Sequence, residues 1–268
     1  MGKFDGKRIT GMVGNLVFRE GKNGGIVQTA PDKVRQTKDT KLMSGIFGQR
    51  SILAAAMRYN LVSLYRENND GQMVNRLNKP VGEVLRQCYD KSTGTYTFEK
   101  DSFSRLAGLE FNIKSPLNNS MWVQPEMMLD GAILRIKIPQ MEIPADFKFY
   151  STSNCCELTA AVYVISLENA LEGVPMVQTI TIDQNQDTVP AQVFEFEVPE
   201  GGLCVAGIGL DYFFLQNGIK RLMNSKEFSP AALCGAVITP GTFVLRDENG
   251  NPAELWETTW SNVFKLNL

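Results

Sequence analysis

Carboxylates, cysteines and tryptophans are the side chains with which this chain could do chemistry, because it contains no histidine. Histidine is the commonest general base and metal ligand, and its side chain titrates near neutral pH. Its absence excludes a Ser-His-Asp hydrolase, a zinc enzyme with histidine ligands and a histidine-based pH switch. Chemistry that uses paired carboxylates or a lysine stays open.

The carboxylates form no recognisable catalytic or metal-binding pattern. Glu195 and Glu197 lie two apart on a predicted strand and share one face, whereas a glycosidase needs two carboxylates facing each other across a substrate. The run from Asp183 resembles the start of a calcium loop, but Thr188 replaces the required glycine and Phe194 the required glutamate. The sequence therefore predicts a non-enzymatic protein with no catalytic residue, no metal site and no cofactor.

The cysteines also lack a functional pattern. They are odd in number, contain no C-x-x-C motif, and include an adjacent pair that rarely bridges internally; they are Cys88, Cys155, Cys156, Cys204 and Cys234. This usage is typical of reduced, partly buried thiols in a cytosolic protein.

Two tryptophans near the end of the chain are candidates for a ligand face. Trp256 and Trp260 are an even number apart, so they share a face if the predicted strand 255–266 is regular. Such a pair can stack on a sugar, or it can serve as a core residue or an interface anchor. Both interpretations stay open.

Charge divides the chain near residue 105. Residues 1–105 contain 18 Lys and Arg against 10 Asp and Glu, whereas residues 106–268 contain 9 against 19. Opposed charges on one chain suggest contact between copies or with an anionic partner. The basic arm could neutralise nucleic-acid phosphates or an acidic surface on a neighbouring copy, and both stay open.

The residues that must position these groups begin with a Gly-punctuated arm at 1–36. Apolar runs at 12–18 and 26–29 flank Gly21–Gly25, which predicts a β-hairpin. A helical segment follows at 37–104, with an amphipathic helix expected from about residue 40 to 65 and a heptad seam from Val74 to Cys88 interrupted by Pro80. These helices either dock on the chain's own β domain or contact another subunit.

Residues 105–268 predict a β domain. Short apolar or alternating runs separated by turn signals predict strands at 107–113, 121–128, 132–138, 157–166, 176–182, 191–198, 203–211, 233–238, 242–246 and 255–266. The predicted fold class is mainly β, an antiparallel β-sandwich (jelly-roll or immunoglobulin-like) preceded by an N-terminal β-hairpin and the helical segment.

The first residues, MGKFDGKRIT, have no apolar core, so we expect no signal peptide. The longest helix-like apolar stretch, Ile52–Met57, is too short to cross a membrane. We therefore expect cytoplasmic synthesis and no membrane partner, with release by lysis if the protein belongs to a particle.

The N-terminal sequence resembles a family of uncharacterised bacterial proteins. The likeness lies in Gly11–Arg19 (GMVGNLVFR), Pro31–Thr37 (PDKVRQT) and Ser44-x-x-Phe47-Gly48, and covers about the first 60 residues. It implies a Gly-rich hairpin, a basic linker and a helix before β-rich sequence, and it implies no activity. The layout of an arm before a β domain is also similar in outline to capsid and tail-type assembly subunits.

These observations favour a structural subunit of a phage- or tail-like particle, shell or filament. The basic arm of one copy would meet the acidic β domain of the next, head to tail. The residues predicted to take part in assembly are Arg19, Arg35, Phe47, Leu77 and Trp256. The alternative is a carbohydrate- or protein-binding β-sandwich module with Trp256 and Trp260 on its ligand face.

Overall fold

The computed structural model describes residues 2–21, 24–30, 36–247 and 249–268 of the chain. The chain divides into two compact units, Met1–Ser44 and Gly45–Leu268, called here the N-terminal unit and the body. The division lies inside the first helix, whereas the sequence predicted divisions after residues 36 and 104. The predicted helical segment is not a separate unit, because most of it packs on the strands that follow.

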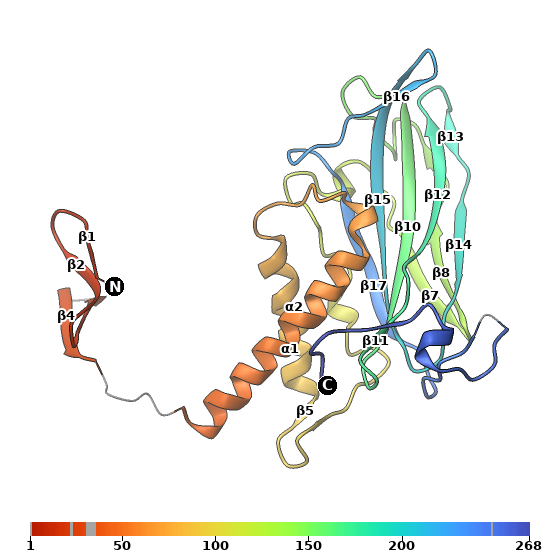
Figure 1. Cartoon of the computed structure of the whole chain (residues 1–268). Helices are drawn as coiled ribbons and strands as arrows, with labels where there is room; N and C mark the ends of the chain where they lie inside the picture. The colour runs from red at the N-terminus through yellow and green to blue at the C-terminus, as the bar shows by residue number, and fades with distance from the viewer. Residues whose placement is uncertain (1, 22–23, 31–35, 248) are drawn as a thin grey trace. The chain divides into compact units, whose positions relative to one another are not determined.

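The N-terminal unit contains an antiparallel meander in the order β1-β2-β3-β4 (Figure 1). Gly14 and Asn15 form a two-residue loop after β2, and Gly14 takes a φ of +60° that other residues rarely adopt. The run 12–18, predicted as one strand, is therefore divided by a turn. The strands are β1 (Lys3–Phe4), β2 (Ile9–Val13), β3 (Leu16–Gly21) and β4 (Gly24–Thr29).

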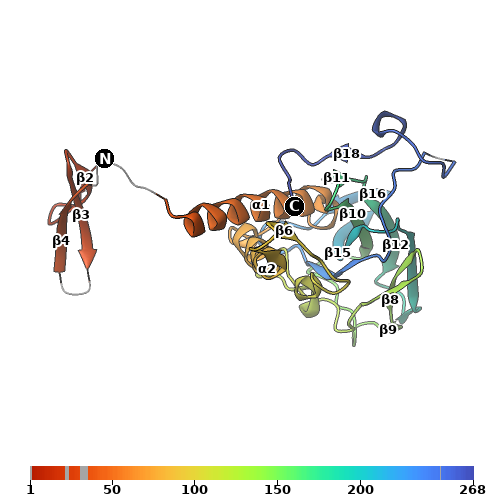
Figure 2. The same cartoon turned by 90° about the horizontal axis from the view of Figure 1, so that it is seen from below.

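Two helices form one layer of the body. They are α1 (Lys38–Asn60), whose first residues belong to the N-terminal unit, and α2 (Met73–Cys88), with the 3-10 turn η1 (Val62–Leu64) between them. Figure 2 shows the two helices side by side. Gly82 of α2 allows the close approach, since a Cβ atom there would lie 2.6 Å from Cδ of Arg50 in α1. Pro80 lies inside α2 and does not end it.

The body's large sheet is centred on two long antiparallel strands, β10 (Cys155–Ser166) and β15 (Leu203–Gln216). On the other side of β10 lie β12 (Met176–Asp183) and β11 (Leu171–Glu172), and β11 pairs with β18 (Ser261–Asn262). On the other side of β15 lie β17 (Ala231–Ile238) and β16 (Ile219–Leu222). All of these pairings are antiparallel.

A smaller antiparallel sheet in the order β14-β8-β7 covers one face of the large sheet. Its strands are β7 (Glu126–Asp130), β8 (Ile133–Ile138) and β14 (Gln192–Glu197). The remaining elements are short: β5 (Tyr89–Asp90), β6 (Thr95–Tyr96), β9 (Met141–Glu142), β13 (Thr188–Val189), η2 (Ser104–Leu106), η3 (Leu117–Asn119) and η4 (Leu255–Glu257).

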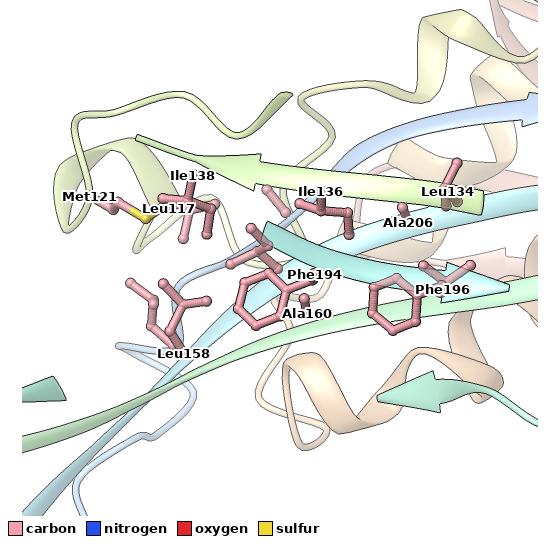
Figure 3. Close-up of a cluster of buried hydrophobic side chains, with 14 of the residues drawn as sticks. Leu117, Met121, Leu134, Ile136, Ile138, Leu158, Ala160, Phe194, Phe196 and Ala206 are labelled. Carbon is pink, nitrogen blue, oxygen red and sulfur yellow. The ribbon is translucent and has the colours of Figure 1, made fainter. Parts of the chain in front are cut away.

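The main core fills the space between the two sheets (Figure 3). Leu158 and Ala160 of β10 meet Ile136 of β8 and Phe194 of β14 in one buried cluster. The alternate residues of β10 and β15 point to the opposite face, where Leu64 of η1 packs. The two long strands are buried on both faces, which explains why they contain nearly continuous apolar runs and few alternating polar residues.

Two glycines of β15 allow η1 to approach the large sheet. A Cβ atom on Gly209 would overlap the carbonyl oxygen of Leu64 and lie 2.8 Å from the carbonyl carbon. A Cβ atom on Gly207 would lie 2.7 Å from Cδ1 of Leu64, and the register of β15 with β17 shifts between Ala206 and Gly207. Glycine in this apolar strand therefore marks both a bulge and close backbone packing.

The mainly β, antiparallel class is confirmed, with 39% of residues in strands and 20% in helices, and the β-structure includes a half-barrel. Three predicted strands are wrong. Residues 107–113 contribute an isolated bridge at Glu110, residues 242–246 one at Arg246, and residues 255–266 form η4 and the two-residue β18. Turns interrupt residues 107–113, and the 3-10 helix η4 and a later turn interrupt residues 255–266, so the apolar residues of these two stretches do not follow an extended strand.

Candidate assembly interface

The N-terminal sheet has one predominantly apolar face. Cross-strand partners share a face of a sheet, and the pairs Phe4–Ile9, Val13–Leu16 and Phe18–Val27 belong to the same face, called here the apolar face. The opposite face mixes apolar with basic side chains, since Lys3 pairs with Thr10, Met12 with Val17 and Arg19 with Ile26.

No other described segment of the N-terminal unit covers this apolar face. Phe4 is 70% exposed and Val27 is 55% exposed, and Ile9, Val13 and Leu16 are also exposed. Among the residues described between 2 and 44, none is buried. An isolated small sheet gains stability when an apolar face is packed against something else. The apolar face is therefore the strongest candidate for an interface.

A hollow of about 270 Å³ on the N-terminal sheet brings two arginines together. Arg8, Thr10, Phe18, Arg19 and Glu20 are among the residues that line it. Arg8 forms an exposed ion pair with Glu20, whereas Arg19 has no partner among the residues that the structure describes. The hollow thus offers a guanidinium group that can pair with an acidic group from outside the sheet.

The other residues predicted for assembly are dispersed. Arg35 lies outside the described residues. Phe47 is exposed on α1, with Cζ of Arg50 4.0 Å from its ring centroid. Leu77 is only 1% exposed because it packs inside the body, so its prediction as an interface residue is corrected: the heptad seam of α2 joins the helices to their own chain.

The two tryptophans do not form one platform. Trp256 is 80% exposed on η4, whereas Trp260 is half-buried, with its ring edge-on to Phe243 at a centroid distance of 4.6 Å. Trp260 also lies against Gly173, where a Cβ atom would be 3.3 Å from the indole. The segment is not a regular strand, so the even spacing does not place the two rings together.

Trp260 does line a hollow of its own, of about 270 Å³. Phe243, Glu197, Arg246 and Thr259 also line this hollow, and Trp256 does not. The hollow could not be predicted from the sequence, because its described lining residues come from five separate stretches of the chain. Trp260 was the one signal in the sequence that pointed to it.

Asp70, Glu110 and Asp211 are partly or fully buried carboxylates of the body, each with its own partners. Asp70 accepts hydrogen bonds from Arg76 at 2.5 Å and from the Ile113 amide, which lower its pKa to about 2 although burial opposes this. Burial raises the pKa of Glu110 to about 7, and the Leu117 amide donates to it. Burial also raises the pKa of Asp211, which pairs with Arg66. None of the three lines a hollow described here, so they link elements of the fold.

The five cysteines are free thiols. Burial raises the pKa of Cys204 to about 12, which keeps it protonated and unreactive.

No group of three Cys, Asp or Glu side chains that could hold a metal ion occurs within the described ranges. Across the same ranges, every helix is too short or too polar to cross a membrane.

Comparisons with protein-family models, with curated proteins and with solved structures found no match. The resemblance of the N-terminal sequence to a bacterial family is thus still an expectation, and the function must be inferred from the surfaces just described.

Proposed function

We propose that the protein is a non-enzymatic structural subunit that self-assembles into a particle, shell or filament. The N-terminal unit of one copy docks on the body of the next. The observation that carries the proposal is the apolar face, which no described segment of the N-terminal unit covers, in a unit with no buried residue among those described. Covering this face removes apolar area from water, which is the main driving force of association.

Charge favours a second copy as the partner. The N-terminal unit contains nine Lys and Arg against four Asp and Glu, a net charge of +5. The body contains 18 against 25, a net charge of −7. Opposite net charges on the two units steer one copy towards the next, and a contact between two different surfaces propagates as a ring or a chain.

Nucleic acid is the less favoured partner for the basic residues. Phosphate neutralisation needs exposed Lys and Arg, which the N-terminal unit has, but it does not bury the apolar face. A groove for single strands also needs aromatic side chains on which bases stack, and Phe4 and Phe18 are the aromatic residues among those described in the sheet.

We also propose that the body is related to the β-sandwich folds. The small sheet facing the large sheet is a variant of the β-sandwich, with the helical layer added on the other side. Capsid and tail-type subunits are similar in outline, with an arm that reaches a neighbour.

The test compares two double variants of the N-terminal sheet by light scattering on a sizing column at low salt. Ile9→Ser/Val27→Ser removes two side chains from the apolar face, and we expect each change to weaken association by roughly tenfold or more. Met12→Ser/Ile26→Ser is the matched control, since it removes two similarly exposed apolar side chains from the opposite face.

We expect wild type and control to elute at many times 29.8 kDa and the apolar-face variant to elute near 29.8 kDa. Raising the salt concentration should also reduce the wild-type mass. A wild-type protein that is monomeric at low salt, or equal masses for the two variants, would refute self-assembly through this face. Excess absorbance at 260 nm on the assembled peak would instead assign the basic residues to nucleic acid.

The hollow beside Trp260 supports a second candidate function, carbohydrate binding. An indole face with a hydroxyl and two charged side chains can stack on a sugar ring and bond its hydroxyls. We expect maltohexaose or cellohexaose to change the tryptophan fluorescence, and Thr259→Val to weaken that response about fivefold. Trp256→Ala is the control and should leave the affinity unchanged. No response to either sugar, or its loss in Trp256→Ala alone, would contradict this candidate.

A further inference from the structure

An open cavity of about 630 Å³ in the body is a third hollow, and it shares Phe243 with the hollow beside Trp260. It lies between the β5-β6 hairpin, the turn after β10 and the loops before β15 and after β17. Figure 1 and Figure 2 both show the hairpin beside the last residues of the chain, and Asn267 also lines the cavity. The volume falls within the range of sites that take small organic groups.

Aromatic rings form one wall of this cavity. The rings of Tyr96 and Phe98 are parallel within 4°, with their centroids 5.8 Å apart. Phe98 in turn packs on the buried Phe103, which fixes its position. Phe243 contributes a third ring. Aromatic faces carry partial negative charge and attract cations that have lost part of their water.

The charged groups at the cavity are acidic. Glu168 lines it, and the Glu200 carboxylate lies at its edge, where Oε2 would be 2.6 Å from a Cβ atom on the lining residue Gly241. The hydroxyls of Thr95, Thr97 and Thr242 can accept hydrogen bonds. The described lining residues include no Lys or Arg. Aromatic faces, carboxylates and acceptors together select a positively charged ligand with an apolar stem.

We propose that this cavity binds an organic cation, an alkylammonium or alkylguanidinium group. Two sources have this chemistry: a Lys or Arg side chain from the N-terminal unit of another copy, and a free small cation. The first source rests on the self-assembly proposed above. The preference of the cavity for cations does not depend on it.

The test is calorimetric titration of the full chain with butylguanidinium, with butanol as the neutral and butyrate as the anionic analogue. We expect butylguanidinium to bind roughly tenfold more tightly than butanol, and butyrate not to bind. Glu168→Gln should weaken butylguanidinium binding about threefold, and Phe98→Leu by a similar factor. Glu126→Gln is the matched control, because it removes one exposed acid from β7, away from the cavity, and should change nothing.

Equal affinities for butylguanidinium and butanol, no binding at millimolar concentration, or an unaltered affinity in both cavity variants would overturn the proposal. Glu168 is exposed, so its variant is expected to fold even if Phe98→Leu does not.

Light scattering then distinguishes the two sources of the cation. If saturating butylguanidinium and Glu168→Gln both reduce the assembled mass, a side chain of another copy occupies the cavity. If binding occurs while the mass is unchanged, the ligand is a free cation. Binding to a protein that is always monomeric would refute self-assembly and leave the cation site standing.

Discussion

Replacing Gly209 by alanine is expected to destabilise the body by about 3 kcal/mol or more. The added Cβ atom would overlap the Leu64 carbonyl oxygen and lie 2.9 Å from its Cα atom. These are backbone atoms, so no side-chain rotation relieves the overlap, and η1 must move away from the large sheet. Urea unfolding followed by far-UV circular dichroism measures the loss as a lower midpoint.

Gly48→Ala in α1 is the matched control for this prediction. A Cβ atom on Gly48 meets nothing within 4 Å, and alanine has the higher helix propensity. We expect this change to stabilise the protein by about 0.5–1 kcal/mol.

A double variant tests the proposed cause of the Gly209 effect. Adding Leu64→Ala to Gly209→Ala should not restore stability, because the opposing atoms belong to the backbone. If Gly209→Ala unfolds at the wild-type midpoint, η1 does not pack on β15 as described.

Removing the positive partner of Asp211 should have the next largest effect. Asp211 is 3% exposed, its Oδ2 accepts a 2.6 Å bond from Nε of Arg66, and its Oδ1 has no partner among the described residues. Arg66→Leu leaves this carboxylate buried and unpaired, which we expect to cost about 2–4 kcal/mol at neutral pH. Leucine is unbranched at Cβ, so it tolerates the φ of +46° at this position about as well as arginine.

Two further variants test whether the loss of stability in Arg66→Leu comes from the buried charge of Asp211. Lys114→Leu breaks an ion pair whose cation is equally exposed, but its partner Glu227 is in water, so we expect a change within about 0.5 kcal/mol. Arg66→Leu combined with Asp211→Leu removes both charges and should recover part of the loss. Equal losses in Arg66→Leu and Lys114→Leu would contradict the assigned role of Arg66.

The Arg66→Leu deficit should also depend on pH. Burial raises the pKa of Asp211, and Arg66 holds it down, so the variant raises that pKa further. A carboxyl with a raised folded-state pKa binds its proton more tightly when folded, and stability falls as pH rises from the unfolded to the folded pKa. The deficit relative to wild type should therefore shrink on acidification towards about pH 4, which unfolding midpoints at several pH values will measure.

Most of the regular elements could be predicted from local patterns. Partial alternation in 191–198 predicted β14, apolar runs predicted β10, β12, β15 and β17, and three-and-four spacing predicted α1 and α2. The failures at 107–113 and 255–266 have one cause: apolar residues there pack individually through loops and 3-10 turns, which leave no periodic signal.

The candidate sites were less accessible to sequence reasoning. The Gly-rich hairpin and basic composition pointed to the N-terminal sheet and to Arg19, but the two faces of that sheet depend on the turn at Gly14 and on strand register. Leu77 has the spacing of an interface residue, yet its stripe is buried in its own chain. The aromatic cavity joins residues as far apart in the chain as Tyr96 and Phe243, and no local pattern connects them.

The sequence by itself determined the class of the protein, the order of its elements, the absence of histidine chemistry and the opposition of charge between its two parts. Periodicity, turn residues and composition are local properties, so they could be assigned before any contact was known. The tertiary structure decided that the helices cover the large sheet, that Trp256 and Trp260 separate, and that no described segment of the N-terminal unit covers the apolar face of its sheet. These outcomes depend on which surfaces meet, and packing between distant segments is a property of the folded chain as a whole.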